Sequence, residues 1–243
     1  MFSETELRVQ ICEIARRIYE RGYSVAADGN LSVRLEGGDL LVTPSGVFKG
    51  NLYPEDIVRT SADGGLRASP RGLRPSGELL MHLAIYRVRP DVQAVVHAHP
   101  PIAVGFTLAG VSLAQCLLPE VILSFGDIPT APYSTPTTAA VPEAISELIR
   151  TSDALMLARH GSLTVGQDLE SAYHRLEQIE HTARITLAAR QLGEVKPLPK
   201  DEVDRLLEMR RRLGLGPVAE PCNNCGACLS PASERMLAGS RSR

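Results

Sequence analysis

Two histidines separated by a single residue, His97 and His99, are the strongest chemical signal in the sequence. They lie at the end of the apolar segment 93–98, which is typical of a β-strand. Side chains two residues apart in a strand point to the same face, so the two imidazoles are expected side by side, with Val96 and Ala98 facing the core. Paired imidazoles suit Zn²⁺ or another divalent transition metal. A bare pair of this kind can equally be an ordinary polar strand surface.

A third imidazole, His160, follows the apolar segment 154–158 and precedes Gly161. A glycine at this point permits either a sharp turn or the close approach of the backbone to a ligand. Three histidines with an open coordination position are typical of catalytic rather than structural zinc. The third histidine therefore favours a metal centre over an ordinary strand surface.

The motif Pro-Ser-Gly-Glu at 75–78 could supply an acidic group and an anion site. Ser76 can cap a helix that begins at Glu78, and the free N–H groups of a helix N-terminus favour an anion such as phosphate. Glu78 could be a fourth metal ligand or a general base. An ordinary capping pair is the simpler alternative, and His82 is expected to be packed or hydrogen-bonded within the helix.

Two polar loops adjoin expected strands, with Gly29 and Asn30 in the first and Ser45 and Gly46 in the second. Small hydroxyl and amide side chains beside exposed backbone N–H groups can form a phosphate nest. The same residue types are common in ordinary turns, so each loop alone is a weak signal.

A third kind of site is indicated by Cys222, Cys225 and Cys228. Three thiolates at this spacing could bind zinc or hold an iron–sulfur cluster. No fourth cysteine lies beside them, and the surrounding residues lack an apolar period. The alternative is an irregular tail with free thiols, which we place at residues 214–243.

The remaining segments must position these groups. Helices are expected between Ser3 and Gly22 and over 78–88, 101–109, 142–150, 169–187 and 201–213, where Asp201 would cap the last helix. Strands are expected over 31–35, 40–43, 57–60, 93–98, 117–122, 128–131, 154–158 and 163–165. This pattern predicts an α/β fold in which helices flank one central, mostly antiparallel sheet within a single catalytic domain, residues 1–213.

Composition excludes some classes of protein. The 243 residues contain 26 Lys and Arg against 28 Asp and Glu, and this near balance argues against a dedicated nucleic-acid binder. No apolar run approaches the roughly 18 residues of a membrane span, and the acidic start of the chain is unlike a signal peptide. A cytoplasmic protein without a membrane partner is expected. Arg210, Arg211 and Arg212 are expected to form the solvated end of the last helix.

Five motifs occur in a fixed order: Gly-Asn-Leu-Ser at 29–32, Thr-Pro-Ser-Gly at 43–46, Pro-Ser-Gly-Glu at 75–78, His-Ala-His at 97–99 and His-Gly at 160–161. With these motifs, the chain from Thr5 to Leu192 resembles the class II aldolase/adducin family. Its enzymes include L-fuculose-1-phosphate aldolase and L-ribulose-5-phosphate 4-epimerase. The motifs are specific for the family and much less specific for a substrate.

The resemblance implies the roles of the motif residues. A zinc ion, or another divalent metal such as Mn²⁺ or Co²⁺, would be held by His97, His99 and His160. Glu78 matches the family's acidic residue, which ligates the free metal and acts as acid and base. The phosphate of a small phosphorylated sugar would bind at the family's phosphate loops, which match Gly29, Asn30, Ser45, Gly46, Ser76 and Gly77. The family also implies a homotetramer with active sites at subunit interfaces.

The activity implied by the resemblance is metal-dependent aldol cleavage of a ketose 1-phosphate or deoxyketose 1-phosphate. Breaking the C3–C4 bond releases an aldehyde and leaves an enediolate of dihydroxyacetone phosphate, which the metal stabilises as a Lewis acid. Glu78 would then protonate C3. The alternatives on the same metal site are a sugar-phosphate 4-epimerase, a methylthioribulose-phosphate dehydratase and a hydroxy-acid decarboxylase. An adducin-like protein without activity is disfavoured, because all three histidines and Glu78 are present.

The sequence departs from the family at two tyrosines. The segment 118–122 has no tyrosine where L-fuculose-1-phosphate aldolase has one, and no tyrosine follows Tyr173 to match the family's C-terminal catalytic tyrosine. The group that delivers a proton to the aldehyde oxygen is therefore left open. A 5-deoxyribulose or 5-methylthioribulose 1-phosphate, whose aldehyde end is less polar, fits as well as fuculose 1-phosphate.

Overall fold

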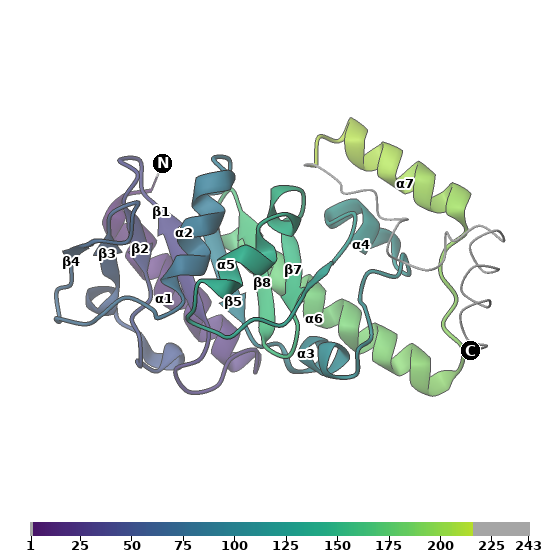
Figure 1. Ribbon diagram of the computed structural model, residues 1–243, viewed down its shortest axis with the longest axis horizontal. Helices are drawn as coiled ribbons and strands as arrows, with labels where there is room; N and C mark the ends of the chain where they lie inside the picture. Colours follow the sequence, from purple (N-terminus) through teal and green to yellow (C-terminus); the bar gives the residue numbers. More distant parts are fainter. Residues whose placement is uncertain (1, 216–243) are drawn as a thin grey trace.

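A single eight-stranded sheet runs through the protein, in the order β4-β3-β2-β1-β5-β8-β7-β6 (Figure 1). The computed structural model describes residues 2–215. Neighbouring strands pair antiparallel, apart from β6, which runs parallel to β7. The predicted α/β fold with a mostly antiparallel sheet is confirmed.

The strands are β1 (Asn30–Arg34), β2 (Leu40–Val42), β3 (Val58–Thr60), β4 (Leu66–Ala68), β5 (Ala94–Ala98), β6 (Thr130–Ala131), β7 (Ala154–Leu157) and β8 (Gly161–Gly166). The α-helices are α1 (Glu4–Glu20), α2 (Leu79–Val88), α3 (Pro101–Leu108), α4 (Pro119–Ser124), α5 (Ala140–Ile145), α6 (Leu169–Leu192) and α7 (Lys200–Arg212). Short 3₁₀ turns occur at η1 (Lys49–Asn51), η2 (Pro54–Asp56) and η3 (Leu148–Arg150). None of these helices is both long enough and apolar enough to cross a bilayer.

Helices cover both faces of the sheet, and α3 packs beside α6 on β7. One core packs α1 and α6 against β1 and β5, and the other packs α2 and α5 against β5, β7 and β8. Figure 1 shows α2 and α5 on the near face of the sheet. Alternation along β5 sends Val96 and Ala98 into the first core and Val95 into the second. His97 therefore lies on the same face as Val95, beside α2.

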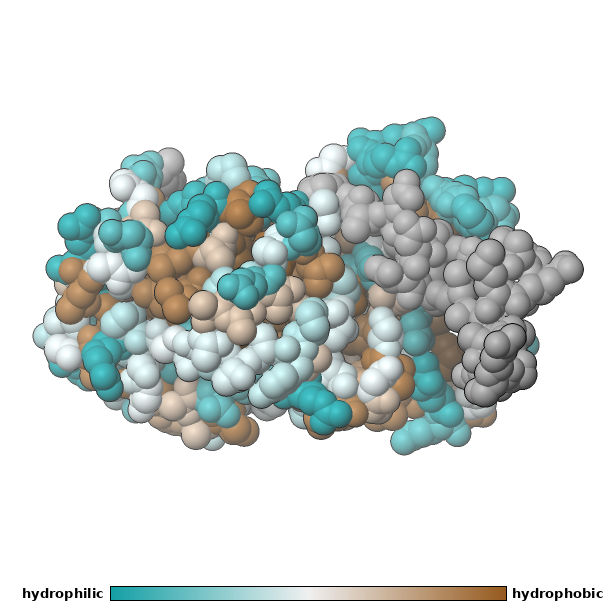
Figure 2. Space-filling view, in the orientation of Figure 1, coloured by the Kyte–Doolittle hydropathy of each residue, from teal (hydrophilic) through white to brown (hydrophobic). Residues whose placement is uncertain are grey.

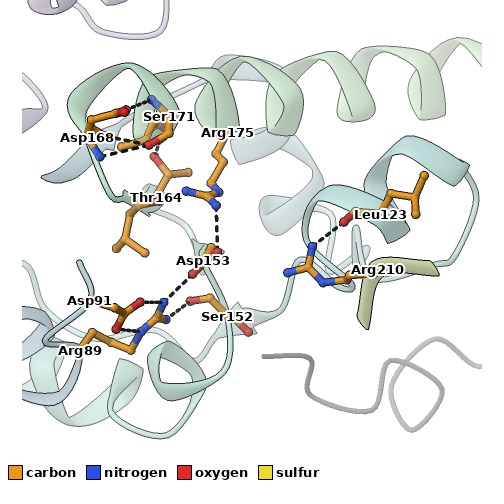
Figure 3. Close-up of polar contacts among 12 residues, drawn as sticks. Arg89, Asp91, Leu123, Ser152, Asp153, Thr164, Asp168, Ser171, Arg175 and Arg210 are labelled. Atoms are coloured by element: carbon orange, nitrogen blue, oxygen red, sulfur yellow. Dashed lines mark hydrogen bonds and ion pairs between the residues drawn. The ribbon is translucent and has the colours of Figure 1, made fainter. Parts of the chain in front are cut away.

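An ion-pair network ties three elements together at the end of the sheet where β5 and β7 begin (Figure 3). Asp153 accepts hydrogen bonds from Arg89 at 2.7 Å and from Arg175 at 3.0 Å. Arg89 follows α2, Asp153 precedes β7 and Arg175 belongs to α6. Because Asp153 and Arg89 are buried, the charges are held in a low-dielectric setting where each needs its partner.

The segment 117–122 was predicted as a strand, and that prediction is wrong. Residues from Pro119 onward form α4, with the proline at the first helical position, where its missing N–H costs nothing. Ile122 of α4 packs against Val203 and Leu207 of α7, so packing decides the structure of this β-branched segment. Conversely, β4 was not predicted, because its three residues are all exposed and carry no apolar alternation.

Several boundaries also differ from the sequence-based expectation. The segment 142–150 divides into α5 and η3, and only Thr130 and Ala131 of 128–131 pair as a strand. Helix α7 begins at Lys200, so Asp201 lies in its first turn and is not its cap. Arg210 is not solvated: it is 1% exposed and donates a hydrogen bond to the carbonyl of Leu123 (Figure 3). Cys222, Cys225 and Cys228 lie outside the described residues.

Candidate metal and phosphate site

The three histidines of the sequence motifs converge at one end of the central strands. His97 ends β5, His99 follows it, and His160 precedes β8, which pairs with β5. One ring nitrogen from each histidine lies within 4.8 Å of the others. Among the described residues, this is the group with the geometry to hold a metal ion.

The hydrogen bonds of His97 show which of its ring nitrogens could bind a metal. Its Nδ1 lies 2.8 Å from the carbonyl oxygen of Ser162, which can only accept, so Nδ1 carries the proton. The unprotonated Nε2 then faces His99 Nε2, at 3.1 Å. A carbonyl that fixes the tautomer in this way is the usual second partner of a metal-binding histidine.

Glu78 completes the cluster. One carboxylate oxygen lies 3.3 Å from Nε2 of His97, and the other lies 3.4 Å from Nε2 of His160. The second oxygen, Oε1, is buried and has no hydrogen-bond partner among the described residues. Buried polar atoms are rarely left unpaired, so an oxygen that faces three imidazoles fits a cation placed among them.

The electrostatics of the cluster favour a metal over protons. Burial alone would raise the pKa of Glu78, but positive charge at the positions of His97 and His160, together with the hydrogen bond from Asn30, holds it well below its usual range. Burial and the neighbouring imidazoles lower the pKa of His99 to about 3 and also lower the pKa of His160. Glu78 is thus an anion and these imidazoles are neutral near pH 7, the states in which both bind a metal.

Gly161 allows the histidines to pack this closely. A Cβ atom on Gly161 would lie 2.5 Å from the carbonyl oxygen of Ala98 and 2.6 Å from Cδ2 of His99. This is a close approach of the backbone to the neighbouring strand and its histidines, whereas the sequence left open a close approach to a ligand. The sharp turn is made instead by Arg159, whose φ is +60°.

The six loop residues expected to bind phosphate also come together, around the start of α2. Ser45 N–H donates to Arg74 O at 2.9 Å, and Ser76 N–H donates to Thr43 O at 3.1 Å. The loops at 43–46 and 75–78, called here the first and second serine loops, therefore lie side by side. Gly46 follows the first serine and Gly77 the second.

The loop that contains Gly29 and Asn30, called here the glycine loop, contacts the second serine loop: Nδ2 of Asn30 donates to the Glu78 carboxylate at 2.8 Å. Gly29 is the point at which this loop packs on β5, since a Cβ there would lie 2.8 Å from His97 O. Helix α2 begins at Leu79, with Glu78 as its N-cap residue, one position later than predicted. Ser76 Oγ accepts from Glu78 N–H at 3.2 Å and so caps the preceding turn.

Lys49 is a part of this region that sequence reasoning missed. Its ammonium group donates to the carbonyls of Ala27, Pro44 and Val47 at 3.0–3.2 Å, and the residue is 2% exposed. Burial lowers the pKa of Lys49 to about 8. The lysine lies in no motif, and the only signal for it is that the chain has three lysines in all. Through these hydrogen bonds Lys49 links the segment before the glycine loop, at Ala27, to the first serine loop, at Pro44, and to Val47 directly after it.

Comparison with known proteins agrees with this geometry. Residues 9–187 match the family model of the Class II Aldolase and Adducin N-terminal domain. The chain belongs to this family. The family assignment made from the five motifs is therefore confirmed, and the protein is an enzyme of the class II aldolase superfamily. Enzymes of this family generally use a divalent metal, which the histidine cluster fits.

Relatives within the class II aldolase family carry out more than one reaction. The 3-oxo-tetronate 4-phosphate decarboxylase of Escherichia coli is 35% identical over 186 residues, covering 75% of this chain and 86% of the relative. The 5-methylthioribulose-1-phosphate/5-deoxyribulose-1-phosphate aldolase of Rhodospirillum rubrum is 33% identical over 212 residues, covering 87% and 94%. A solved L-fuculose 1-phosphate aldolase superposes with a TM-score of 0.79 at 27% identity, covering 87% of this chain and 98% of that structure.

Proposed function

We propose that the protein is a divalent-metal-dependent carbon–carbon lyase that cleaves a ketose or deoxyketose 1-phosphate to dihydroxyacetone phosphate and an aldehyde. The observation that carries the proposal is the buried Glu78 carboxylate, which faces the ring nitrogens of His97 and His160 with one oxygen unpaired. The relatives act on phosphorylated sugars or sugar acids, which agrees with the polar loops beside this carboxylate.

Each group has a defined task in this reaction. His97, His99 and His160 hold the metal, with zinc as the proposed ion and Mn²⁺ or Co²⁺ as substitutes. When bound, the metal supplies Lewis-acid stabilisation of the negative charge that develops on the enediolate oxygens. The three loops bind and orient the phosphate, through Gly29, Asn30, Ser45, Gly46, Ser76 and Gly77.

Glu78 moves the proton at carbon. Its carboxylate receives a hydrogen bond from Asn30, which fixes one oxygen, while Oε1 is left without a hydrogen-bond partner from the described residues. In the cleavage direction the C4 hydroxyl loses its proton as the C3–C4 bond breaks, and the ionised Glu78 takes up this proton and delivers it to C3 of the enediolate. In the synthetic direction Glu78 removes the proton from C3. Because its pKa is held low before substrate arrives, Glu78 begins as a base.

Decarboxylation of a 3-oxo sugar-acid phosphate is a second candidate, favoured by the similarity to the Escherichia coli decarboxylase. Loss of carbon dioxide from 3-oxo-tetronate 4-phosphate leaves the same enediolate of dihydroxyacetone phosphate. The two reactions therefore share the proton transfer from Glu78 to carbon. They differ in the leaving group and in the source of that proton, which is the C4 hydroxyl in the aldolase and solvent water in the decarboxylase. Carbon dioxide leaves without a proton, so this reaction does not need the C-terminal tyrosine that the sequence lacks after Tyr173.

The co-product distinguishes the two reactions, because both release dihydroxyacetone phosphate. The zinc-loaded protein is incubated with deoxyketose 1-phosphates and with 3-oxo-tetronate 4-phosphate, with and without a chelator. Chelator-sensitive release of an aldehyde supports the aldolase, and release of carbon dioxide supports the decarboxylase. If neither substrate yields dihydroxyacetone phosphate while metal is bound, the proposal is wrong and epimerase or dehydratase chemistry takes its place.

We also propose that the active enzyme is a homotetramer with its sites at subunit interfaces. Apolar surface is exposed around α2 on the face shown in Figure 2. Leu80, two residues after Glu78, is 50% exposed, and Leu66 of β4 is 62% exposed. Contiguous exposed apolar patches, rather than single exposed apolar residues, are typical of association surfaces. Light scattering on the purified protein tests the assembly, and a monomer with full activity would contradict it.

A further inference from the structure

A chain of hydrogen bonds runs through the core behind Asn30. His82, one turn into α2, is fully buried, with Nε2 2.6 Å from Asn30 Oδ1 and Nδ1 2.7 Å from Ser32 Oγ. Ser32 Oγ lies 2.8 Å from the hydroxyl of Tyr86, which also donates to the Ser32 carbonyl at 3.0 Å. The chain thus runs from Tyr86 through Ser32 and His82 to Asn30, and from there to Glu78.

The direction of these bonds follows from the carboxylate at one end. An ionised Glu78 can only accept, so the amide group of Asn30 facing it at 2.8 Å is the NH₂ donor. The amide oxygen of Asn30 then faces His82 and must receive a proton, which places a hydrogen on His82 Nε2.

The other half of the chain is consistent with this direction. Burial lowers the pKa of His82 to about 3, so the ring is neutral and its Nδ1 is an acceptor. The hydroxyl of Ser32 donates to that nitrogen. The Tyr86 hydroxyl therefore donates its single proton toward Ser32 Oγ at 2.8 Å and the Ser32 carbonyl at 3.0 Å, both of which can accept. Every contact along the chain then has a donor and an acceptor.

We propose that His82 is a positioning residue of the active site: its Nε2–H group locks the Asn30 amide with the NH₂ group toward Glu78 and the phosphate loops. This inference rests on the proposed function, in which those loops hold the substrate phosphate. With the amide reversed, the Asn30 oxygen would face the Glu78 carboxylate and an incoming phosphate, both of which are acceptors. His82 contacts neither group itself and acts through Asn30.

Two substitutions separate positioning from simple support of the fold. His82→Leu removes the donor to Asn30, whereas His82→Gln retains an N–H group near the place of Nε2. We expect His82→Leu to raise KM for the phosphorylated substrate, and Ki for inorganic phosphate, about tenfold, equivalent to about 1.4 kcal/mol of binding free energy. His82→Gln should recover most of this loss, and both variants should retain wild-type zinc content.

A matched control is Met81→Leu, a volume-conserving change at a neighbouring buried position of α2 that makes no hydrogen bond through its side chain. Its KM and Ki should equal those of the wild type. If His82→Gln loses as much affinity as His82→Leu, or if both variants bind phosphate normally, the positioning role is wrong.

Nitrogen-15 NMR of the histidine-labelled, zinc-loaded full chain tests the inference without any substrate. The His82 resonance is assigned by its loss in the His82→Gln variant. We expect a neutral ring with the proton on Nε2, and a ring protonated on Nδ1 would overturn the proposal. If wild-type protein shows the expected tautomer but cleaves neither substrate, the proposed function fails while the orientation of the Asn30 amide stands.

Discussion

Replacing Gly161 with alanine should disrupt the metal site by forcing apart the strands that hold its histidines. The added Cβ would lie 2.5 Å from Ala98 O, 2.6 Å from His99 Cδ2 and 2.9 Å from His97 Cε1. Favourable contacts between such atoms begin at about 3.5 Å, so the neighbours must move by about 1 Å. One of these neighbours is a backbone oxygen, and the other two are ring atoms of His97 and His99, which we propose as metal ligands.

The size of the effect can be worked from that displacement. Overpacking of a filled core costs about 1–3 kcal/mol. A chain of this length loses about 2–4 °C in Tm for each kcal/mol, so Tm should fall by about 2–12 °C. Metal–ligand distances tolerate changes of only about 0.2 Å, and a misplacement of about 1 Å can cost a hundredfold in rate. Zinc affinity and kcat/KM should therefore fall further than the stability alone would require.

Zinc titration, calorimetry and the dihydroxyacetone phosphate assay measure these effects on one preparation. Gly105→Ala is the matched control, because a Cβ there meets nothing within 4 Å and the residue lies in α3. Alanine is favoured over glycine in a helix by about 0.5–1 kcal/mol, so the control should be slightly stabilised and fully active. A Gly161→Ala protein with wild-type zinc affinity and Tm would refute the close-approach argument.

Other perturbations have equally defined outcomes. Chelation should lower Tm in calorimetry, because an ion at 100 times its Kd contributes about 2.7 kcal/mol to stability; an unchanged Tm would contradict a site specific to the folded state. The pKa of His82 is about 3 when folded and about 6.5 when unfolded, so the unfolded chain binds the extra proton between these values. Stability should therefore decline by about 1.4 kcal/mol per pH unit as the pH falls through this window, and urea melts of His82→Gln should show a shallower decline. Lys49→Met leaves three buried carbonyls without their donor and should cost about 1–3 kcal/mol in urea unfolding, whereas Lys196→Met at an exposed position should cost little. Asp153→Asn breaks a carboxylate bridge between two arginines and should cost about 3–5 kcal/mol, against a negligible change for the exposed Asp204→Asn.

The parts of the site that the sequence predicts are those whose geometry is local. His97 and His99 share a strand, so their two-residue spacing fixes their common face before any tertiary contact is considered. Glu78 and Ser76 are similarly tied to the start of one helix. The start of α1 is local in the same way, because Ser3 and Glu6, three residues apart, make both hydrogen bonds of a capping box.

The remaining parts depend on contacts between distant segments. Lys49 is defined by three carbonyls of two loops, and no pattern around it indicates that they will converge. Arg210 is buried because α7 packs on α4, although the next two residues, Arg211 and Arg212, are exposed arginines. The strand predicted over 117–122 failed for a related reason, since its apolar residues pack on two other helices: Ile122 contacts α7, and Leu118 and Val121 belong to the cluster that contains α3.

The pairing of β5 with β8 also has a consequence for the order of folding. His97 and Ser162, which are joined across this pair, are 65 residues apart in the chain, and Asn30 and Glu78 are 48 apart. Contacts of such long range form late, after the entropy of closing the intervening loops has been lost. A metal held here would bind the folded chain more strongly than the transition state. Zinc should therefore slow unfolding while leaving the folding rate nearly unchanged, so that it increases the kinetic stability of the central strands.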